Sequence, residues 1–247
     1  MEDFRKDENH DLLGLVEQEY PSQDIDKIVL IVAVGRSAST TLQVILNTIP
    51  NSNICGENDA AVIHLLEFYH KIKNTHHYTQ IEFKEVQDKK NISSIFQHRI
   101  KPAWFNTFNF PEIQEYIRQT ILALYKKTPT TNVWGFKEIR WMGKLELLHL
   151  FRELFPQTRV ILTIRENQVK QQQSGFFKDI PNSAEIIQKQ TKEITDFYQR
   201  NRDFCFLHSL ERLYNPGHMV RLFNFIGCGE HIDHEKIKKL LLFTRET

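Results

Sequence analysis

The turn that follows the first apolar segment of the chain contains the residue types of an anion site. The segment Ile28–Val34 is apolar throughout, and it leads into the sequence Gly35-Arg36-Ser37-Ala38-Ser39-Thr40-Thr41. After the turn, apolar residues recur at the spacing of one helix face: Leu42, Ile45, Leu46 and Ile49. A strand, a polar turn and a helix in this order gather backbone N–H groups, hydroxyls and one arginine around a helix N-terminus. Such an arrangement favours the binding of a phosphate or sulfate group.

Three further charged residues, Glu57, Lys137 and Arg165, come just after other apolar segments. These segments have the composition of strands and cover residues 53–55, 133–136 and 160–164. Predicted strands alternate with predicted helices, which indicates an α/β fold with a parallel sheet covered by helices on both faces. Ligands of such sheets bind at the carboxyl ends of the strands. We therefore expect the three residues to lie beside the Gly35–Thr41 turn.

The turn does not fit the phosphate loop of enzymes that hydrolyse ATP or GTP. That loop has the sequence G-x-x-x-x-G-K-[ST], and its lysine reaches the β- and γ-phosphates. No Gly-Lys pair follows the strand here. A plain strand–helix turn with Thr40 as its N-cap is the simpler alternative. One hydroxyl suffices for a cap, however, whereas this turn carries several together with Arg36, so the residues favour anion binding.

The same residues resemble those of sulfotransferases that use 3′-phosphoadenosine-5′-phosphosulfate (PAPS) as donor. The turn and the following Ile54-Cys55-Gly56-Glu57 resemble the phosphosulfate loop and the element with the catalytic base, in the style of tyrosylprotein and bacterial sulfotransferases. The resemblance spans residues 27–227 and continues through three later elements: Trp134-Gly135-Phe136-Lys137-Glu138, Arg165 with Ser174, and Phe206–Leu213 followed by Asn215-Pro216. It implies an enzyme with a three-layer, P-loop NTPase-like sulfotransferase fold.

The resemblance also implies roles for individual residues. The 5′-phosphosulfate would be held by the whole turn: Gly35, Arg36, Ser37, Ala38, Ser39, Thr40 and Thr41. Arg36 and Lys137 would stabilise charge during transfer, and Glu57 would take the proton of the acceptor. Asn58 and Asp59 are rivals of Glu57 because tyrosylprotein-type enzymes have two glutamates there. Lys137 could instead be a solvated lysine. Glu57 could be an acidic residue at a helix N-terminus, where its negative charge interacts favourably with the helix dipole.

Arg165 resembles the arginine that binds the 3′-phosphate of the donor. A guanidinium can hold a phosphate with two hydrogen bonds, and a hydroxyl from the next helix would complete the site. Ser174 lies one residue further from this arginine than in the family pattern, so either Ser174 or Gln173 would supply the second group. The alternatives are a surface arginine or an ion pair of Arg165 with Glu166 or Glu138.

Ala38 departs from the family pattern, which usually has glycine at this position. Alanine is unfavourable there if the backbone needs a positive φ or a very close approach to the phosphate. It is harmless if the position is already helical.

Length and composition indicate one domain with a full core. The chain has 247 residues, a net charge of +1 and 26% charged residues without an acidic or basic block, so no nucleic acid partner is expected. We expect an N-terminal arm (1–26), a single domain (27–247), no membrane span and a cytoplasmic location, since no signal-peptide pattern is visible. The three cysteines have neither disulfide nor metal spacing, and no metal is expected.

The segment 73–110 is rich in histidine and aromatic residues, and its pattern predicts a long irregular insertion. Long loops in compact domains are often functional, so this segment is expected to shape the site of a small-molecule acceptor: a metabolite, sugar or natural product. The resemblance implies that the cofactor is PAPS, which leaves 3′,5′-ADP as product. Two alternatives remain open: a nucleotide or small-molecule kinase with an atypical loop, and a PAPS-binding module without catalysis. The oligomeric state cannot be read from the sequence.

Overall fold

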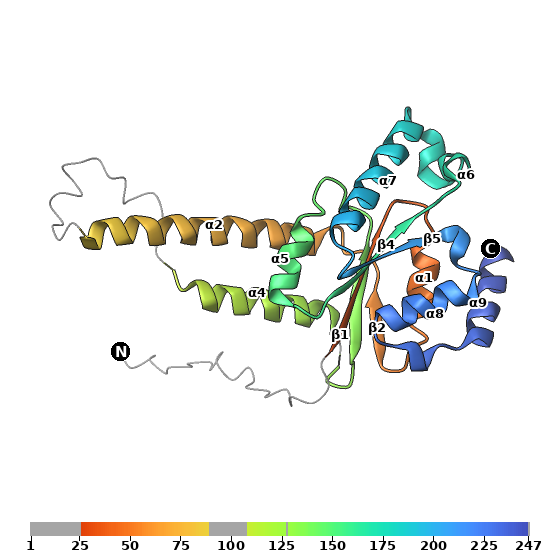
Figure 1. The fold of residues 1–247 in the computed structure, drawn as a ribbon, viewed down its shortest axis with the longest axis horizontal. Helices are drawn as coiled ribbons and strands as arrows, with labels where there is room; N and C mark the ends of the chain where they lie inside the picture. Colours follow the sequence, from red (N-terminus) through yellow and green to blue (C-terminus); the bar gives the residue numbers. More distant parts are fainter. Residues whose placement is uncertain (1–25, 89–107, 127, 247) are drawn as a thin grey trace, which may run out of the picture.

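The computed structural model describes residues 26–88, 108–126 and 128–246 and contains a parallel sheet at its centre (Figure 1). The strands are β1 (Lys27–Ala33), β2 (Ser52–Cys55), β3 (Val133–Glu138), β4 (Arg159–Ile164) and β5 (Cys205–Ser209). Within the described residues their order is β2-β3-β1-β4-β5, and every neighbouring pair is parallel. The three central strands β1, β3 and β4 coincide closely with the predicted ones, because they are largely apolar runs that the sheet buries on both faces.

The carboxyl ends of the three central strands lie at one level. In the sheet register Val32 of β1 faces Glu138 of β3, and Ala33 of β1 faces Thr163 of β4. β3 therefore extends further than expected, and Lys137 lies inside the strand instead of after it. After β1 the chain forms β2 and β3 on one side of β1 and then crosses to form β4 and β5 on the other side. The direction of strand addition therefore reverses at β1, which is the topological switch point of the sheet.

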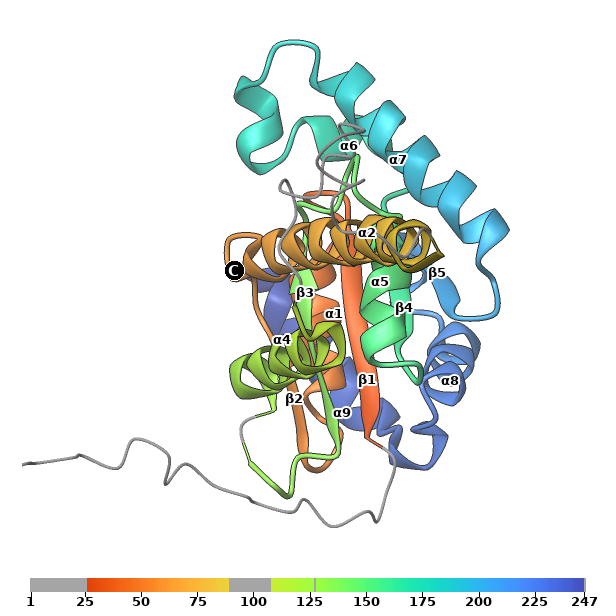
Figure 2. The same cartoon turned by 90° about the vertical axis from the view of Figure 1, so that its left-hand side faces the viewer.

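Helices cover both faces of the sheet and form a three-layer structure (Figure 2). One face carries α1 (Ser39–Leu46), α8 (Pro216–Phe225) and α9 (His234–Glu246), whose apolar side chains pack with Val29 and Ile31 of β1. The other face carries α2 (Ala61–Asp88), α4 (Phe110–Tyr125), α5 (Leu147–Leu154) and α7 (Ser183–Arg200), which pack with Leu30 and Val32. Alternate residues of one strand thus support two cores. The predicted α/β fold class is confirmed.

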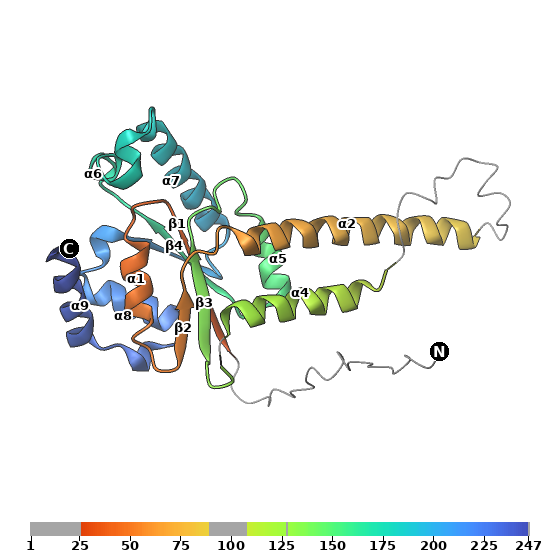
Figure 3. The same ribbon diagram turned by 180° about the vertical axis from the view of Figure 1, so that it is seen from behind.

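The prediction of an irregular segment at 73–110 is wrong over its first part. α2 continues to Asp88, and α4 runs beside it away from the sheet (Figure 3). The ring of Phe110 stacks on Tyr69 at 5.9 Å and on His76 at 4.9 Å between centroids. Phe110 at the start of α4 thus packs on α2, which also contributes Val62, Leu66 and Tyr69 to the core. Residues 89–107 of this segment, and all but the last residue of the expected arm 1–26, lie outside the described residues.

Short elements connect the remaining parts of the chain. They are α6 (Gln168–Gln172) and the 3-10 helices η1 (Gly175–Asp179), η2 (Leu210–Arg212) and η3 (Gly229–His231). α8 begins with a cap: the Asn215 side chain accepts a hydrogen bond from the N–H of His218, and Pro216 occupies the first turn. α6 and η1 follow β4 and lie near the carboxyl edge of the sheet, where they reach the turn after β1.

Candidate functional site

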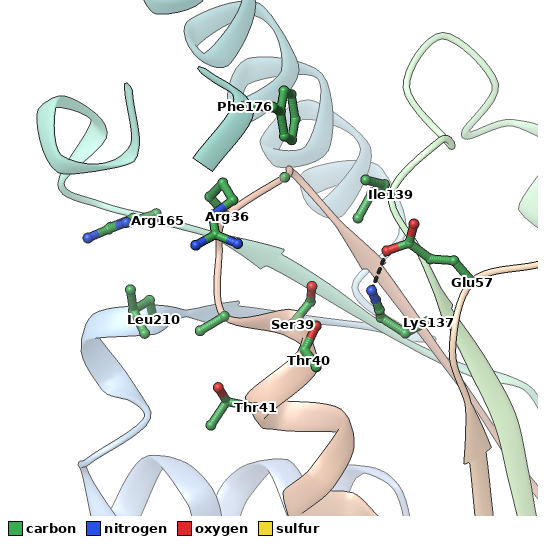
Figure 4. A pocket seen from close by; sticks show the side chains of 12 residues that line it. Arg36, Ser39, Thr40, Thr41, Glu57, Lys137, Ile139, Arg165, Phe176 and Leu210 are labelled. Atoms are coloured by element: carbon green, nitrogen blue, oxygen red, sulfur yellow. Dashed lines mark hydrogen bonds and ion pairs between the residues drawn. The ribbon is translucent and has the colours of Figure 1, made fainter. Parts of the chain in front are cut away.

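A cavity of about 400 Å³ opens at the carboxyl edge of the sheet, beside the turn between β1 and α1. Its lining brings together most of the predicted site residues and is drawn in Figure 4: Gly35, Arg36, Ala38, Ser39, Thr40, Thr41, Glu57, Lys137, Ile139, Arg165, Phe176 and Leu210. Three of these side chains are cationic and one is acidic. Arg165 lies at one end of the view and the Glu57–Lys137 pair at the other, with Arg36 and the turn between them. The cavity therefore attracts anions along its length.

The turn has an unusual backbone. Arg36 has φ 64° and Ala38 has φ 59° and ψ 26°, both in the left-handed region. Ala38 is also the N-cap residue of α1, so no hydroxyl caps this helix and the Thr40 cap alternative is wrong. The first turn of α1 instead presents Ser39, Thr40 and Thr41 to the cavity. The condition under which alanine is unfavourable at position 38 is met.

Ser37 differs from the rest of the turn because its side chain is turned into the protein. It is fully buried, and its Oγ lies 2.9 Å from Oγ1 of Thr163 on β4. The hydroxyl therefore fastens the turn to the neighbouring strand and does not line the cavity. Of the polar groups of Ser37, only the backbone N–H is available to donate a hydrogen bond to an anion.

α6 and the start of η1 pack on the turn and support it. The buried Gln171 donates a hydrogen bond from Nε2 to the carbonyl of Gly35 (2.7 Å). Gly175 has φ 58°, and a Cβ at this position would lie 2.7 Å from Nε of Arg36. Phe176 packs so closely on Gly35 that a Cβ there would lie 3.0 Å from the ring. Sequence reasoning missed Gln171 and Phe176, and only the Gln-rich run before Gly175 hinted at a special segment.

Gln173 and Ser174, the two candidates for the second 3′-phosphate group, do not line the cavity. Gln173 is exposed, and the Ser174 hydroxyl donates to the carbonyl of Gln171 at 2.9 Å. Their role in binding stays a prediction.

Glu57 lies between two cations. Its Oε1 accepts a hydrogen bond from Nζ of the buried Lys137, and its Oε2 accepts one from Nη1 of Arg140 at 3.0 Å. The rivals of Glu57 are placed differently. Asn58 donates to the Tyr125 hydroxyl at 3.3 Å, and the almost fully exposed Asp59 lies 3.2 Å from Arg140. Among these three residues Glu57 alone lines the cavity.

The sequence did not identify Arg140, and it offered Glu138 only as a possible partner of Arg165. Glu138 is 2% exposed, and its carboxylate accepts hydrogen bonds from the Ala60 N–H, from the N–H groups of Ile139 and Arg140, and from Arg140 Nη1. The hydrogen bond to Glu138, followed by the fields of the nearby carboxylates, raises the pKa of Arg140. The charge run Lys137-Glu138-Ile139-Arg140 at the end of a buried strand was the signal that could have revealed this cluster.

Arg165 has no ion-pair partner among the described residues. Glu166 pairs with Arg212 at 3.2 Å and Glu138 with Arg140 at 2.9 Å, so neither expected ion pair of Arg165 forms. The Nε atom of Arg165 is buried and has no hydrogen-bond partner in the described part of the chain. A buried donor without a partner is costly, and an anion in the cavity would supply one.

Glu211 fixes the backbone that follows Arg165. Its carboxylate accepts the N–H groups of Glu166 (2.9 Å) and Asn167 (3.0 Å). Burial works to raise the pKa of Glu211, but these hydrogen bonds and the field of Arg165 lower it. The segment between β4 and α6 is thus held by a charged acceptor, which sets the direction in which Arg165 leaves the sheet.

Two general searches of the described residues add to this description. No three histidine, cysteine, aspartate or glutamate side chains in ranges 26–88, 108–126 and 128–246 gather into a group that could hold a metal ion. Of the helices that the structure describes, none combines the length and apolarity needed to cross a membrane.

Comparisons with known proteins identify the family of the chain. Residues 29–222 match the sequence model of a family described as "Sulfotransferase family". The fold is similar to that of the sulfotransferase domain of the olefin synthase from Synechococcus PCC 7002 (14% identity, TM-score 0.44, 85% of this chain and 76% of that one). It is also similar to sulfotransferase STF9 from Mycobacterium avium (14% identity, TM-score 0.45, 93% of this chain and 70% of that one). No curated protein matches the chain.

Proposed function

We propose that this chain, which belongs to the sulfotransferase family, transfers a sulfuryl group from PAPS to a hydroxyl or amine of a small-molecule acceptor. The family assignment confirms the resemblance drawn from the sequence. The donor and the acceptor class go beyond it and form the proposal.

The observation that carries the proposal is the pair of anion-attracting ends in one cavity. At one end the unpartnered, buried Nε of Arg165 fits a 3′-phosphate. At the other end the N-terminus of α1, Arg36 and Lys137 surround a place for a 5′-phosphosulfate. PAPS carries anionic groups at both of these positions. A ligand with a single phosphate would leave Arg165 without a partner.

The chemistry of transfer can be assigned to residues of this chain. The bond between sulfur and the bridging oxygen of the donor breaks, a bond between sulfur and the acceptor oxygen or nitrogen forms, and 3′,5′-ADP leaves. Arg36, Lys137 and the backbone N–H groups of the turn would stabilise the charge on the sulfuryl and leaving oxygens, in analogy with phosphoryl transfer. Glu57 would take the proton of the acceptor. Holding donor and acceptor in the right geometry would supply most of the remaining rate enhancement.

The Glu57–Lys137 ion pair adds a condition to this mechanism. Lys137 must turn from Glu57 toward the donor before Glu57 can act as a base. A donor anion favours this change because it competes with Glu57 for the same ammonium group. We therefore expect the donor to bind before the acceptor.

A transfer assay tests the proposal. The protein is incubated with ³⁵S-labelled PAPS and a panel of phenols, alcohols, sugars and amines, and labelled products and free sulfate are separated. We expect label on at least one class of acceptor, and a loss of transfer of about 100-fold or more in Glu57→Gln, because general bases contribute about 10²- to 10⁴-fold.

Binding of 3′,5′-ADP by Glu57→Gln serves as the control, since this variant keeps the turn and Arg165. Labelled ATP with Mg²⁺ is offered in a parallel reaction. Phosphate transfer from ATP, or the absence of both labelled product and labelled sulfate from PAPS, would contradict the proposal.

A further inference from the structure

Arg140 holds one oxygen of the Glu57 carboxylate while Lys137 holds the other. Nη1 of Arg140 donates to Oε2 at 3.0 Å, and Nζ of Lys137 donates to Oε1. The two cations come from different places in the site. Lys137 lines the cavity, whereas Arg140 does not. Only Lys137 is therefore positioned to exchange Glu57 for an anionic ligand.

Arg140 is itself held in place by Glu138. Nη1 of Arg140 donates to Oε1 of Glu138 at 2.9 Å, and the same oxygen accepts the N–H groups of Ile139 (2.8 Å) and Arg140 (3.0 Å). The other oxygen accepts the N–H of Ala60 at 3.0 Å. This buried carboxylate thus ties the end of β3, which bears Lys137, to the segment after β2, which bears Glu57.

An anion in the cavity would change the hydrogen-bond partners of Glu57. When Lys137 turns toward the anion, Oε1 of Glu57 loses its charged partner. Without a second contact the carboxylate would be free to rotate or to follow Lys137 toward the anion. The hydrogen bond from Arg140 to Oε2 does not depend on the cavity, so it persists when Lys137 leaves.

We propose that Arg140 is a positioning residue for Glu57, and that it keeps the carboxylate directed at the acceptor once the donor has drawn Lys137 away. The inference rests on the proposed function, in which Glu57 is the base. Arg140 acts through Glu57 and does not touch the transferred group. Glu138 completes the arrangement because it holds the same Nη1 atom that reaches Glu57.

The experiment compares crystal structures and turnover of Arg140→Ala, Arg140→Lys and the wild type with 3′,5′-ADP bound. In Arg140→Ala we expect the Glu57 carboxylate to move by more than about 0.5 Å or to occupy alternative conformers, since catalytic groups need placement within about that distance. Release of sulfate from saturating ³⁵S-PAPS, with water as the acceptor, should fall about 10- to 100-fold. The affinity for 3′,5′-ADP, measured by calorimetry, should stay within about twofold of the wild type, because Arg140 lies outside the cavity. Arg140→Lys should recover part of the rate, because it keeps the charge without the planar fork.

Arg118→Ala is the matched control. The Arg118 side chain is as exposed as that of Arg140 (40% against 43%) and pairs with Glu115 on α4 at 3.0 Å, away from the cavity. This variant should leave the place of Glu57 and the rate unchanged.

A Glu57 carboxylate that stays in place in Arg140→Ala would overturn the inference, and so would an unchanged rate. Failure of the wild type to bind 3′,5′-ADP would instead contradict the proposed function. The two failures are therefore distinguishable.

Discussion

At the scale of single residues, Ala38 shows how a departure from a family pattern acquires a physical meaning. The sequence left two possibilities, a positive φ or a helical position, and the structure gives φ 59° and ψ 26°. A side chain with a Cβ is strained in this conformation by about 1–2 kcal/mol. The turn therefore keeps its anion-binding backbone at some cost in stability.

Ala38→Gly should raise the free energy of unfolding by about 0.5–1 kcal/mol, because relief of the left-handed strain exceeds the added entropy of the unfolded chain. Urea unfolding measures this change. Ala123→Gly, an exposed position inside α4, is the control and should lower the same free energy by about 1 kcal/mol. A decrease in both variants would show that position 38 carries no such strain.

Residue types at the site were predictable, but several contacts were not. Arg36, Ser39, Glu57, Lys137 and Arg165 could be identified because each lies at or just after the end of a recognisable strand. The inward turn of Ser37 and the support from Gln171 and Arg140 depend on partners far away in the sequence. The separations are 126, 136 and 83 positions for the bonds to Thr163, Gly35 and Glu57. Such contacts are set by the sheet register and leave no local pattern.

At the scale of elements, the strands and most helices were predicted well, whereas the full length of α2 was not. A buried parallel strand is nearly all apolar, so its sequence is distinctive. Beyond residue 73 the sequence of α2 is rich in histidine and polar residues, and it carries no such signal. The prediction of a loop from 73 onward failed for this reason.

Gly135 in β3 provides a test of the close packing of the central strands. It pairs with Val29 of β1, and a Cβ at Gly135 would lie 1.9 Å from the Val29 carbonyl oxygen. Gly135→Ala should lower the free energy of unfolding by about 3 kcal/mol or more, because the neighbouring backbone must shift. Thermal and urea unfolding measure it.

Gly217→Ala in α8 is the control, since a Cβ there would meet its nearest atom only at 3.5 Å. Its effect should stay within about 1 kcal/mol, with stabilisation the expected direction in a helix. Equal effects of the two substitutions would contradict the packing of β1 against β3.

At the scale of the whole molecule, a buried histidine pair links stability to pH. His208 on β5 and His218 on α8 are 1% and 2% exposed, and their Nδ1 and Nε2 atoms lie 2.9 Å apart. Burial, followed by neighbouring positive charges, lowers the pKa of His208 to about 3 and that of His218 to about 4. Both imidazoles are therefore neutral in the folded protein at pH 7.

Acid should destabilise the fold through this pair. Above pH 6.5 neither state binds these protons, and no effect is expected. Below pH 6.5 the unfolded chain takes up protons that the folded protein excludes, so the free energy of unfolding falls by up to about 1.4 kcal/mol per pH unit for each imidazole. The fall ends near the lowered pKa values.

Urea unfolding at pH 7, 6 and 5 measures this slope. His218→Gln should flatten it by removing one titrating group. A slope that does not differ between the wild type and His218→Gln would contradict the role of the pair.

The overall architecture followed from the alternation of strands and helices, and the donor end of the site followed from residues at strand ends. The contribution of Ile139 and Phe176 to the cavity could not be predicted, because they come from distant segments that only the tertiary structure brings together. These residues carry no motif of their own.

The central claim is that one cavity holds a donor with phosphate groups at both ends. Calorimetric titration of the protein with 3′,5′-ADP and with 5′-AMP tests it most directly. We predict that 3′,5′-ADP binds at least about 10-fold more tightly, since a charged hydrogen bond such as that from Arg165 contributes about 1.5–3 kcal/mol. Arg165→Ala should remove this difference. Equal affinities of the wild type for the two nucleotides, or no binding of 3′,5′-ADP at about 1 mM, would contradict the account.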